Sequence, residues 1–278
     1  MSLSLVTNTA SMVGQRNINK THTRLNKSLN RLTTGRRINS AMDDAAGLGV
    51  SEAMRAQIRG LAQASRNAND GLSVVQTAES AMGEISNMLI RMRELTVQAA
   101  SDTLNDSERS YLDTEFQDLV SEIDRVSSTT LFNGNVLTDG SFAVDPLDFQ
   151  VGFENGADFR ISVTIDDVST SGLGFLGAEA VGTKLDAQDS MDILDAALTA
   201  VSTSRSLLGS RANRLVAASA GADVMRENLS AANSRIRDTD VAAETSQMAR
   251  SQVLMQAGTS MLAQANAQTQ LAMQLIGG

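Results

Sequence analysis

The chain has 278 residues, enough for one or two domains with a sizeable core, and a formal net charge of −9. Only 3% of its residues are aromatic, Trp and Cys are absent, and Pro occurs once. This composition excludes disulfides and thiolate metal sites, and it favours long helices packed through aliphatic and small side chains.

The charge is distributed unevenly along the chain. Residues 1–40 hold seven Lys or Arg and no acid, residues 235–278 hold three charges of each sign, and residues 41–234 carry −16. The amino terminus lacks a basic start followed by an apolar run and a small-residue cleavage site. We therefore expect no conventional signal peptide, and either a cytoplasmic protein or one exported by a route that keeps its first residues.

The first predicted helix has the rhythm of a coiled coil. Seam positions are spaced 4, 3, 4 and 3 residues apart at Ile18, His22, Leu25, Leu29 and Leu32. Bases lie beside this seam at Arg16, Lys20, Arg24, Lys27 and Arg31. No aromatic or groove-reading motif accompanies the bases, so we expect a solvated or interface-pairing face and no nucleic-acid binding. His22, the only histidine, is expected to pack and to do no chemistry.

A second helix is predicted from residue 47 to residue 100. Apolar residues repeat at 4 and 3 from Met54 to Val75, and the rhythm resumes after one break from Ala78 to Met92. Without interruption this helix would be about 80 Å long at 1.5 Å per residue. The pattern therefore predicts a rod.

A third helix and a β-hairpin follow. Asn105, Asp106 and Ser107 supply capping side chains, and an amphipathic pattern runs from Leu112 to Val126. Phe132-Asn133-Gly134 indicates a turn. Between residues 140 and 166 the period changes to two, with Asn155-Gly156 between two alternating runs, which predicts the hairpin.

Two more helices complete the chain after a Gly- and Ser-rich loop at 169–182. Heptads run from Met191 to Ala222 and continue with imperfections to Ile236. Residues 251–278 contain no charged residue, and large and small side chains alternate in two heptad phases. The large phase contains Met248, Met255, Leu262 and Ile276, with Thr269 as its polar member. Seven amides around this last helix argue against a membrane span, and its seam predicts a partner helix or copies of the chain.

The order of these patterns resembles bacterial flagellin along nearly the whole chain. The matching stretches are INSAMDDAAGL (38–48), ASRNANDGLSVVQTAE (64–79), RMRELTVQAA (91–100), EIDRVSSTTLFNG (122–134), RENLSAANSRIRD (226–238) and LMQAGTSMLAQAN (254–266). The chain passes from the hairpin to the next helix in about 25 residues, so it resembles a short form without the large variable outer domains. Thr269-Gln270 stands where flagellins usually carry Pro-Gln.

The resemblance implies a mainly α fold: a long coiled-coil rod with paired terminal helices and a small β-hairpin segment. Residues 1–40 with 235–278 would form the inner tube of a filament, and residues 41–234, with the hairpin near 140–166, the outer tube. The chain would be a structural filament subunit, exported unfolded and secreted for swimming motility. Its implied partners are copies of itself, an export chaperone, the filament cap and hook-junction proteins.

The resemblance also implies a surface for the vertebrate Toll-like receptor of flagellin. The matching positions are Arg91, Leu95 and Glu115, and the same face is implied to contact neighbouring subunits. Contacts between subunits alone would explain these residues equally well.

Other functions are weighed against this one. An enzyme is not expected, because there is no Cys, one seam His and no phosphate-binding glycine loop. The acidic pairs Asp43-Asp44 and Asp166-Asp167 are expected to cap or flank helices or strands, and no metal or cofactor is predicted. The hook-filament junction protein, which shares the coiled-coil ends, is the alternative.

Overall fold

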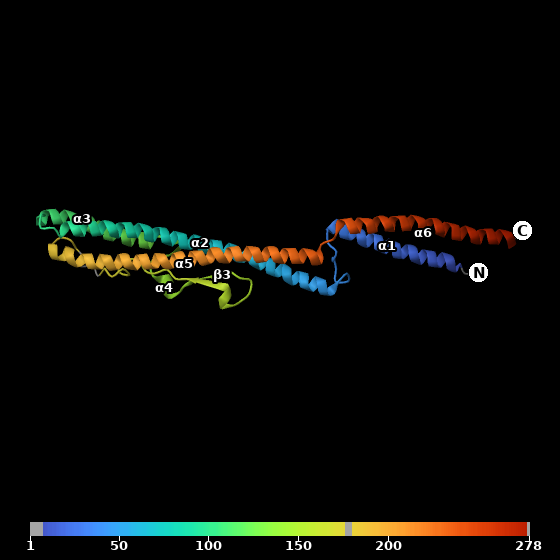
Figure 1. The fold of residues 1–278 in the computed structure, drawn as a ribbon, viewed down its shortest axis with the longest axis horizontal. Coiled ribbons are helices and arrows are strands. Elements are labelled where there is room, and N and C mark those ends of the chain that lie inside the picture. The colour runs from blue at the N-terminus through green and yellow to red at the C-terminus, as the bar shows by residue number, and fades with distance from the viewer. Residues whose placement is uncertain (1–7, 176–179, 277–278) are drawn as a thin grey trace. The chain divides into compact units, whose positions relative to one another are not determined.

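The computed structural model describes the backbone of residues 8–175 and 180–276, and the side chains of residues 8–175 and 180–267. The helices are α1 (Thr9–Thr34), α2 (Ala45–Ala99), α3 (Asp106–Thr129), α4 (Ser141–Val144), α5 (Lys184–Arg237) and α6 (Val241–Ile276), with one 3₁₀ turn at Ala157–Phe159 (Figure 1). Two compact units result, residues 1–56 with 228–278, and residues 57–227. The predicted mainly α fold with long helices is confirmed.

Local sequence explains where helices begin and end. Asn105 caps α3 in a reciprocal capping box, in which its side chain accepts from the Glu108 amide and the Glu108 carboxylate accepts from the Asn105 amide. Gly35 ends α1 in the left-handed region at φ 69°. The predicted turn at Asn133-Gly134 is present, with φ of 51° and 87°, and it joins β1 (Leu131–Phe132) to β2 (Asn135–Val136).

The predicted β-hairpin is present between β3 (Leu147–Gln150) and β4 (Arg160–Val163), paired from Leu147↔Val163 to Gln150↔Arg160. Its connection is longer than the Asn155-Gly156 turn that the sequence suggests. The Gln150 side-chain amide donates to the backbone carbonyl oxygens of Gly152 and Glu154, at 3.0 and 2.7 Å. The Val151 backbone amide still donates to the Phe159 carbonyl at 2.9 Å, so pairing continues one residue beyond β3, and Phe153 lies outside the ladder.

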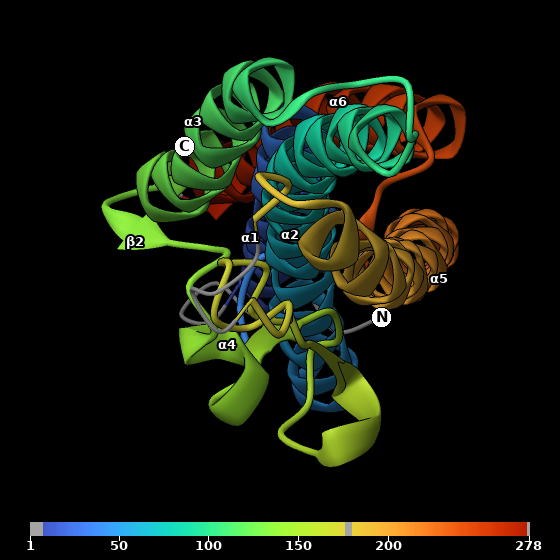
Figure 2. The same ribbon diagram turned by 90° about the vertical axis from the view of Figure 1, so that its left-hand side faces the viewer.

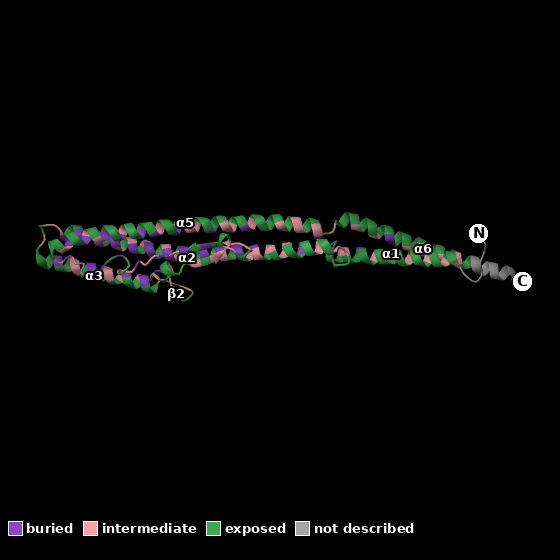
Figure 3. Ribbon diagram, turned by 90° about the horizontal axis from the view of Figure 1, so that it is seen from below, coloured by how far each residue is buried: buried purple, intermediate pink, exposed green. Residues whose placement is uncertain are grey.

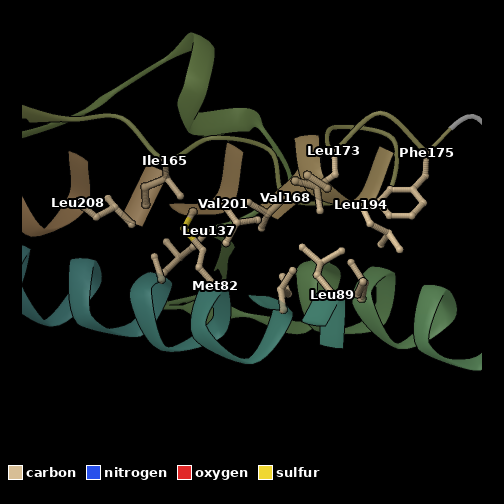
Figure 4. Packing of buried hydrophobic residues seen from close by; sticks show 14 of the residues in the cluster. Met82, Leu89, Leu137, Ile165, Val168, Leu173, Phe175, Leu194, Val201 and Leu208 are labelled. Carbon is tan, nitrogen blue, oxygen red and sulfur yellow. The ribbon is translucent and has the colours of Figure 1, made fainter. Parts of the chain in front are cut away.

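The core of the 57–227 unit lies between α2, α3 and α5. Seen end-on, these helices lie beside one another, with α4 and the connecting segments to one side (Figure 2). Met82 and Leu89 of α2 face Leu194, Val201 and Leu208 of α5, and apolar side chains of the 137–175 connection fill the space near them (Figure 4). The remaining labelled members of this buried cluster are Leu137, Ile165, Val168, Leu173 and Phe175. Burial of this kind stabilises the unit without help from another chain.

Carboxylates of α3 hold the connection in place. Asp124 accepts from the Thr170 amide at 2.9 Å, and Asp113 accepts from the Val181 amide at 2.8 Å. Ser127 and Thr138 exchange side-chain to backbone bonds at 2.9 and 2.8 Å, and both residues are buried. The loop predicted at 169–182 is therefore tied to α3, although residues 176–179 lie outside the described part.

The hairpin packs against α2 at positions where α2 carries glycine. A Cβ built at Gly71 would lie 2.9 Å from the Phe149 ring, and one at Gly60 would lie 2.9 Å from Phe153 Cβ. Between these two glycines, the Asn67 side-chain amide donates to the Gln150 backbone carbonyl at 3.0 Å. Glycine lowers helix propensity, so its presence here is explained by close approach of the aromatic residues.

We expect Gly71→Ala to destabilise the chain by about 1 to 2 kcal/mol, because the Phe149 ring must move to admit the methyl group. Gly83→Ala is the matched control on the same helix, where nothing lies within 4 Å of the added methyl group. There the gain in helix propensity should stabilise by about 0.5 to 1 kcal/mol. Urea unfolding of both variants measures the difference, and equal stabilisation by both would contradict the proposed packing.

Candidate assembly surfaces

The α1 and α6 helices pack antiparallel along one seam. The Asn8 side chain donates to the Ala265 carbonyl at 3.3 Å, and the Arg31 guanidinium pairs with Glu244 at 3.4 Å near the other end. The residues between them contact in the same order, Gly14 with Leu262 and Ile18 with Gly258. The two ends of the chain are therefore paired through nearly the full length of α1.

Close approach of these helices depends on small residues. A Cβ at Gly258 would lie 3.0 Å from Ile18 Cγ1, and one at Gly14 would lie 3.1 Å from Leu262 Cδ1. Each large side chain thus fits against a glycine of the facing helix, as knobs fit into shallow holes. Among the described residues of this pair, Ser28 and Ser251 are the fully buried ones. Ser28 shares the heptad position of Gly14, and Ser251 shares that of Gly258.

The residues of the predicted seam differ in burial. Six predicted packing residues are half-buried: Ile18, Leu25, Leu32, Met248, Met255 and Leu262. Leu29 is 42% exposed and His22 is also exposed, because Thr21 and Ser28 occupy the second seam phase in their place. The large side chains predicted in that phase would hold the two backbones apart. The side chain of Ile276 lies outside the described residues.

Many apolar side chains of this pair remain exposed. Figure 3 colours the described parts of α1 and α6 almost wholly as exposed or intermediate and places most buried residues on α2, α3 and α5. The large exposed examples on the paired helices are Met12, Val13, Leu29, Val241, Val253, Leu254 and Met261. A two-helix contact cannot cover more than one face of each helix, so this surface is available for further packing.

The connection from α1 to α2 and the connection from α5 to α6 are hydrogen-bonded to each other. Arg36 and Asp238 form an isolated antiparallel bridge, with the Arg37 amide donating to the Arg237 carbonyl at 2.7 Å and the Thr239 amide to the Gly35 carbonyl at 3.0 Å. Ile38, buried at 1% exposure, packs against Gly47 at the start of α2. We call residues 35–44 with 236–240 the crossing segment.

Ion pairs reinforce the crossing segment. The Arg237 guanidinium, almost fully buried, bonds Glu52 at 2.6 Å and Ser51 at 3.3 Å. Hydrogen bonds from Arg237 and Arg55 lower the pKa of Glu52. The Lys27 ammonium lies 2.7 Å from Asp43 and, with backbone amides of Asn39 and Ser40, lowers the pKa of Asp43 to about 2.

Sequence reasoning missed this network, which joins residues about 185 positions apart. The available signal was the set of opposite charges near both crossings, in the stretches 27–55 and 235–240. Nothing in either stretch alone indicates which acid meets which base. The pairing follows from the tertiary arrangement.

The predicted receptor residues lie on α2 and α3. Arg91 bonds Glu115 at 2.7 Å and Glu94 at 3.0 Å, and both bonds raise the pKa of Arg91 above its ordinary value. Arg91 and Glu115 are about half exposed. Leu95 is 1% exposed and packs in the core, so of the three predicted residues only Arg91 and Glu115 present side chains to solvent.

Comparisons with known proteins identify the family of this chain. Family models for the bacterial flagellin N-terminal and C-terminal helical regions match residues 5–143 and 191–276. A flagellin of Halalkalibacterium halodurans is 46% identical over 90% of this chain and 91% of its own. The chain belongs to the bacterial flagellin family.

Other relatives agree in length as well as in sequence. The flagellar filament 33 kDa core protein of Treponema phagedenis is 39% identical over 97% of this chain and 98% of its own. The flagellin of Bacillus subtilis is 39% identical over 90% and 92%. As a flagellin, this chain is a structural subunit of the bacterial flagellar filament, and the predicted short form is confirmed.

Solved structures share the fold. Bacillus cereus flagellin has a TM-score of 0.50 at 30% identity and covers 56% of this chain and 88% of its own. A flagellar hook-associated protein from Vibrio parahaemolyticus has a TM-score of 0.59 over 70% of this chain and all of its own. At 15% identity the second likeness concerns the fold alone, and it does not favour the junction-protein alternative.

Flagellins are structural proteins, which confirms that this chain is no enzyme. Both acidic pairs have structural partners: Asp44 accepts from the Gly47 amide at 2.8 Å, Asp166 from Ser204, and Asp167 from the Ser169 amide at 2.9 Å. Across residues 8–175 and 180–267 no cluster of three or more His, Asp or Glu side chains could hold a metal. Nor does any described helix combine the length and apolarity needed to span a membrane.

The crossing segment predicts an acid-sensitive contribution to stability. The folded pKa of Asp43, about 2, is below its ordinary 3.8, so its contribution is complete above pH 4 to 5 and is lost as the pH falls toward 2. Asp43→Asn should therefore reduce the free energy of unfolding by about 1 kcal/mol at neutral pH, after allowance for partial exposure to solvent. Near pH 2 the variant and the original chain should converge.

Denaturant titrations followed by circular dichroism at several pH values measure this difference. Asp192→Asn is the matched control, because Asp192 is exposed and forms no ion pair with a described residue. A pH-independent loss in Asp43→Asn would show that the amide breaks local geometry and that the charge is not responsible.

Proposed function

We propose that the chain polymerises through α1 and α6, with residues 1–40 and 235–278 forming the inner tube of the filament and residues 41–234 the outer tube. One observation carries the proposal: the α1–α6 pair leaves large apolar side chains of both helices exposed. Contacts with neighbouring copies would bury them, and an open helical array of identical chains provides such contacts repeatedly.

We infer further that the chain works outside the cell, after export in an unfolded state through the flagellar export apparatus. Lack of Cys and a single Pro support this inference, because no disulfide must form and only one proline bond can slow refolding after passage. The exposed apolar face of α6 is a surface that an export chaperone could cover before assembly. The filament cap and hook-junction proteins are the partners expected at the two ends of the filament.

Leu25→Asp should prevent filament formation, because it places an unpaired charge in the half-buried α1–α6 seam. Thr23→Asp introduces the same charge on the exposed face of α1 and is the matched control. Sedimentation and negative-stain microscopy after seeding measure the filament yield. We expect long hollow filaments from the unaltered chain, none from Leu25→Asp, and a clearly larger yield from Thr23→Asp than from Leu25→Asp.

Each outcome has a definite meaning for the seam. Normal filaments from Leu25→Asp would refute the seam as the basis of assembly. Assembly confined to a few copies on added hooks, with no elongation by the unaltered chain, would favour the junction-protein role.

A second function, stimulation of the vertebrate Toll-like receptor for flagellin, is proposed for the surface around Arg91 and Glu115. Supporting it, both side chains are exposed in the single chain and hold each other in place through a 2.7 Å ion pair. Leu95, being buried, would act by fixing the α2 backbone beneath them. In a filament the same surface would contact a neighbouring subunit, so the free subunit is the form expected to signal.

Arg91→Ala should reduce receptor signalling by free subunits at least tenfold, a loss typical of removing a central interface arginine. Arg93→Ala is the matched control, since Arg93 lies two residues away, is similarly exposed and pairs with Asp195. A cell-based reporter titrated with purified monomer measures both. Equal potency of Arg91→Ala and the unaltered chain would leave Arg91 with a role in assembly alone.

A further inference from the structure

Three bases on α1, Arg16, Lys20 and Arg24, form a surface that the fold leaves without an acidic partner. All three are exposed, and none forms an ion pair with a described residue. We call them the unpaired basic stripe. The next two bases along the helix differ, because Lys27 pairs with Asp43 and Arg31 pairs with Glu244.

This stripe costs stability in the isolated chain. Its members are four residues apart, so they lie on one side of α1 at intervals of about 6 Å, and like charges at this spacing repel. The α1 helix contains no acid, and α6 contains only Glu244, which Arg31 already occupies. Nothing within the terminal pair can neutralise the stripe.

The rest of the chain has the complementary charge. Residues 1–56 with 228–278 hold eleven bases and six acids, so the same unit of a second copy would repel the stripe. Residues 57–227 carry −14. Their α3 helix alone has seven acids and two bases, and its exposed Asp118 forms no ion pair with a described residue.

We propose that the unpaired basic stripe of one copy binds the carboxylate-rich surface of the 57–227 unit of a second copy. This inference rests on the proposed self-assembly and adds to it a charged contact that differs from the apolar α1–α6 seam. Opposite charges favour this pairing of surfaces and disfavour contact between two stripes, so the contact would also help to select the register of neighbouring copies.

The test compares two triple variants with the same net charge. Arg16→Gln, Lys20→Gln and Arg24→Gln together remove the stripe while keeping good helix formers. Arg59→Gln, Arg66→Gln and Arg214→Gln together are the matched control, because these exposed bases belong to the acidic unit and form no ion pair with a described residue. The critical concentration for seeded filament growth is measured by sedimentation in about 0.1 M and about 1 M NaCl, where the Debye length is about 10 and 3 Å.

We expect the stripe variant to raise the critical concentration about tenfold at the lower salt, corresponding to three modest ion pairs, and less than about twofold at the higher salt. The control makes the 57–227 unit more acidic, so it should not raise the critical concentration at either salt. A variant with Arg16→Lys and Arg24→Lys should behave as the unaltered chain, since it keeps the charges, and circular dichroism verifies that all variants are equally helical.

Other outcomes overturn the proposal. Growth of the stripe variant equal to that of the unaltered chain at low salt would show that no second copy neutralises the stripe, and a defect that persists in high salt would assign the effect to packing. Binding of the unaltered chain, but not the stripe variant, to phosphatidylglycerol vesicles with unchanged filament growth would identify an anionic lipid surface as the partner. If the unaltered chain forms no filament from seeds at either salt, the self-assembly proposal itself fails.

Discussion

The close contact of α1 with α6 at Gly14 and Gly258 is the interaction on which the terminal part of the fold depends. Glycine at both positions allows Ile18 and Leu262 to lie against the facing backbone, so the two helices share a narrow seam. A narrow seam covers little surface, and the fully buried described residues of this pair are two serines. The pair is thus specific in geometry but poor in buried apolar area, and this combination suits helices that complete their packing in an assembly.

The 57–227 unit, in contrast to the terminal pair, buries a large apolar core. Three helices and the 137–175 connection surround one apolar cluster, in which Met82, Ile85, Leu89 and Met92 have no exposed surface. Polar links such as Asp124 to Thr170 fix the connection over the cluster. The 57–227 unit can therefore hold its structure alone, whereas the α1–α6 pair supplies surfaces for assembly. The crossing segment, with its buried Arg237 guanidinium, holds the start of α2 to the end of α5.

Periodicity and capping chemistry predicted much of this fold because those signals are local. The bounds of α2 and the cap at Asn105 follow from residues a few positions apart, as does the turn at Asn133-Gly134. The exposure of Leu29 could not be predicted in this way. The prediction put large apolar residues in both seam phases, which assumes the ordinary distance between packed helices. The small phase of the last helix, with Gly258 and Ala265, was the sign that α1 must also present small residues, here Thr21 and Ser28. The crossing-segment pairs, such as Arg237 with Glu52, depend on tertiary contacts that no local pattern contains.

Charge and apolar surface are separated on the terminal pair in a way that constrains how copies can meet. The α1 helix carries all of its charge as bases, whereas α6 beyond Arg250 is uncharged and exposes Val253, Leu254 and Met261. If copies met through their basic faces, like charges would repel at each contact along the filament, and the cost would grow with every subunit added. Contact through the neutral α6 faces avoids this cost and buries the exposed apolar side chains. The bases of α1 would then face acids elsewhere in the array, and residues 57–227, which carry −14, offer an acid-rich surface for them.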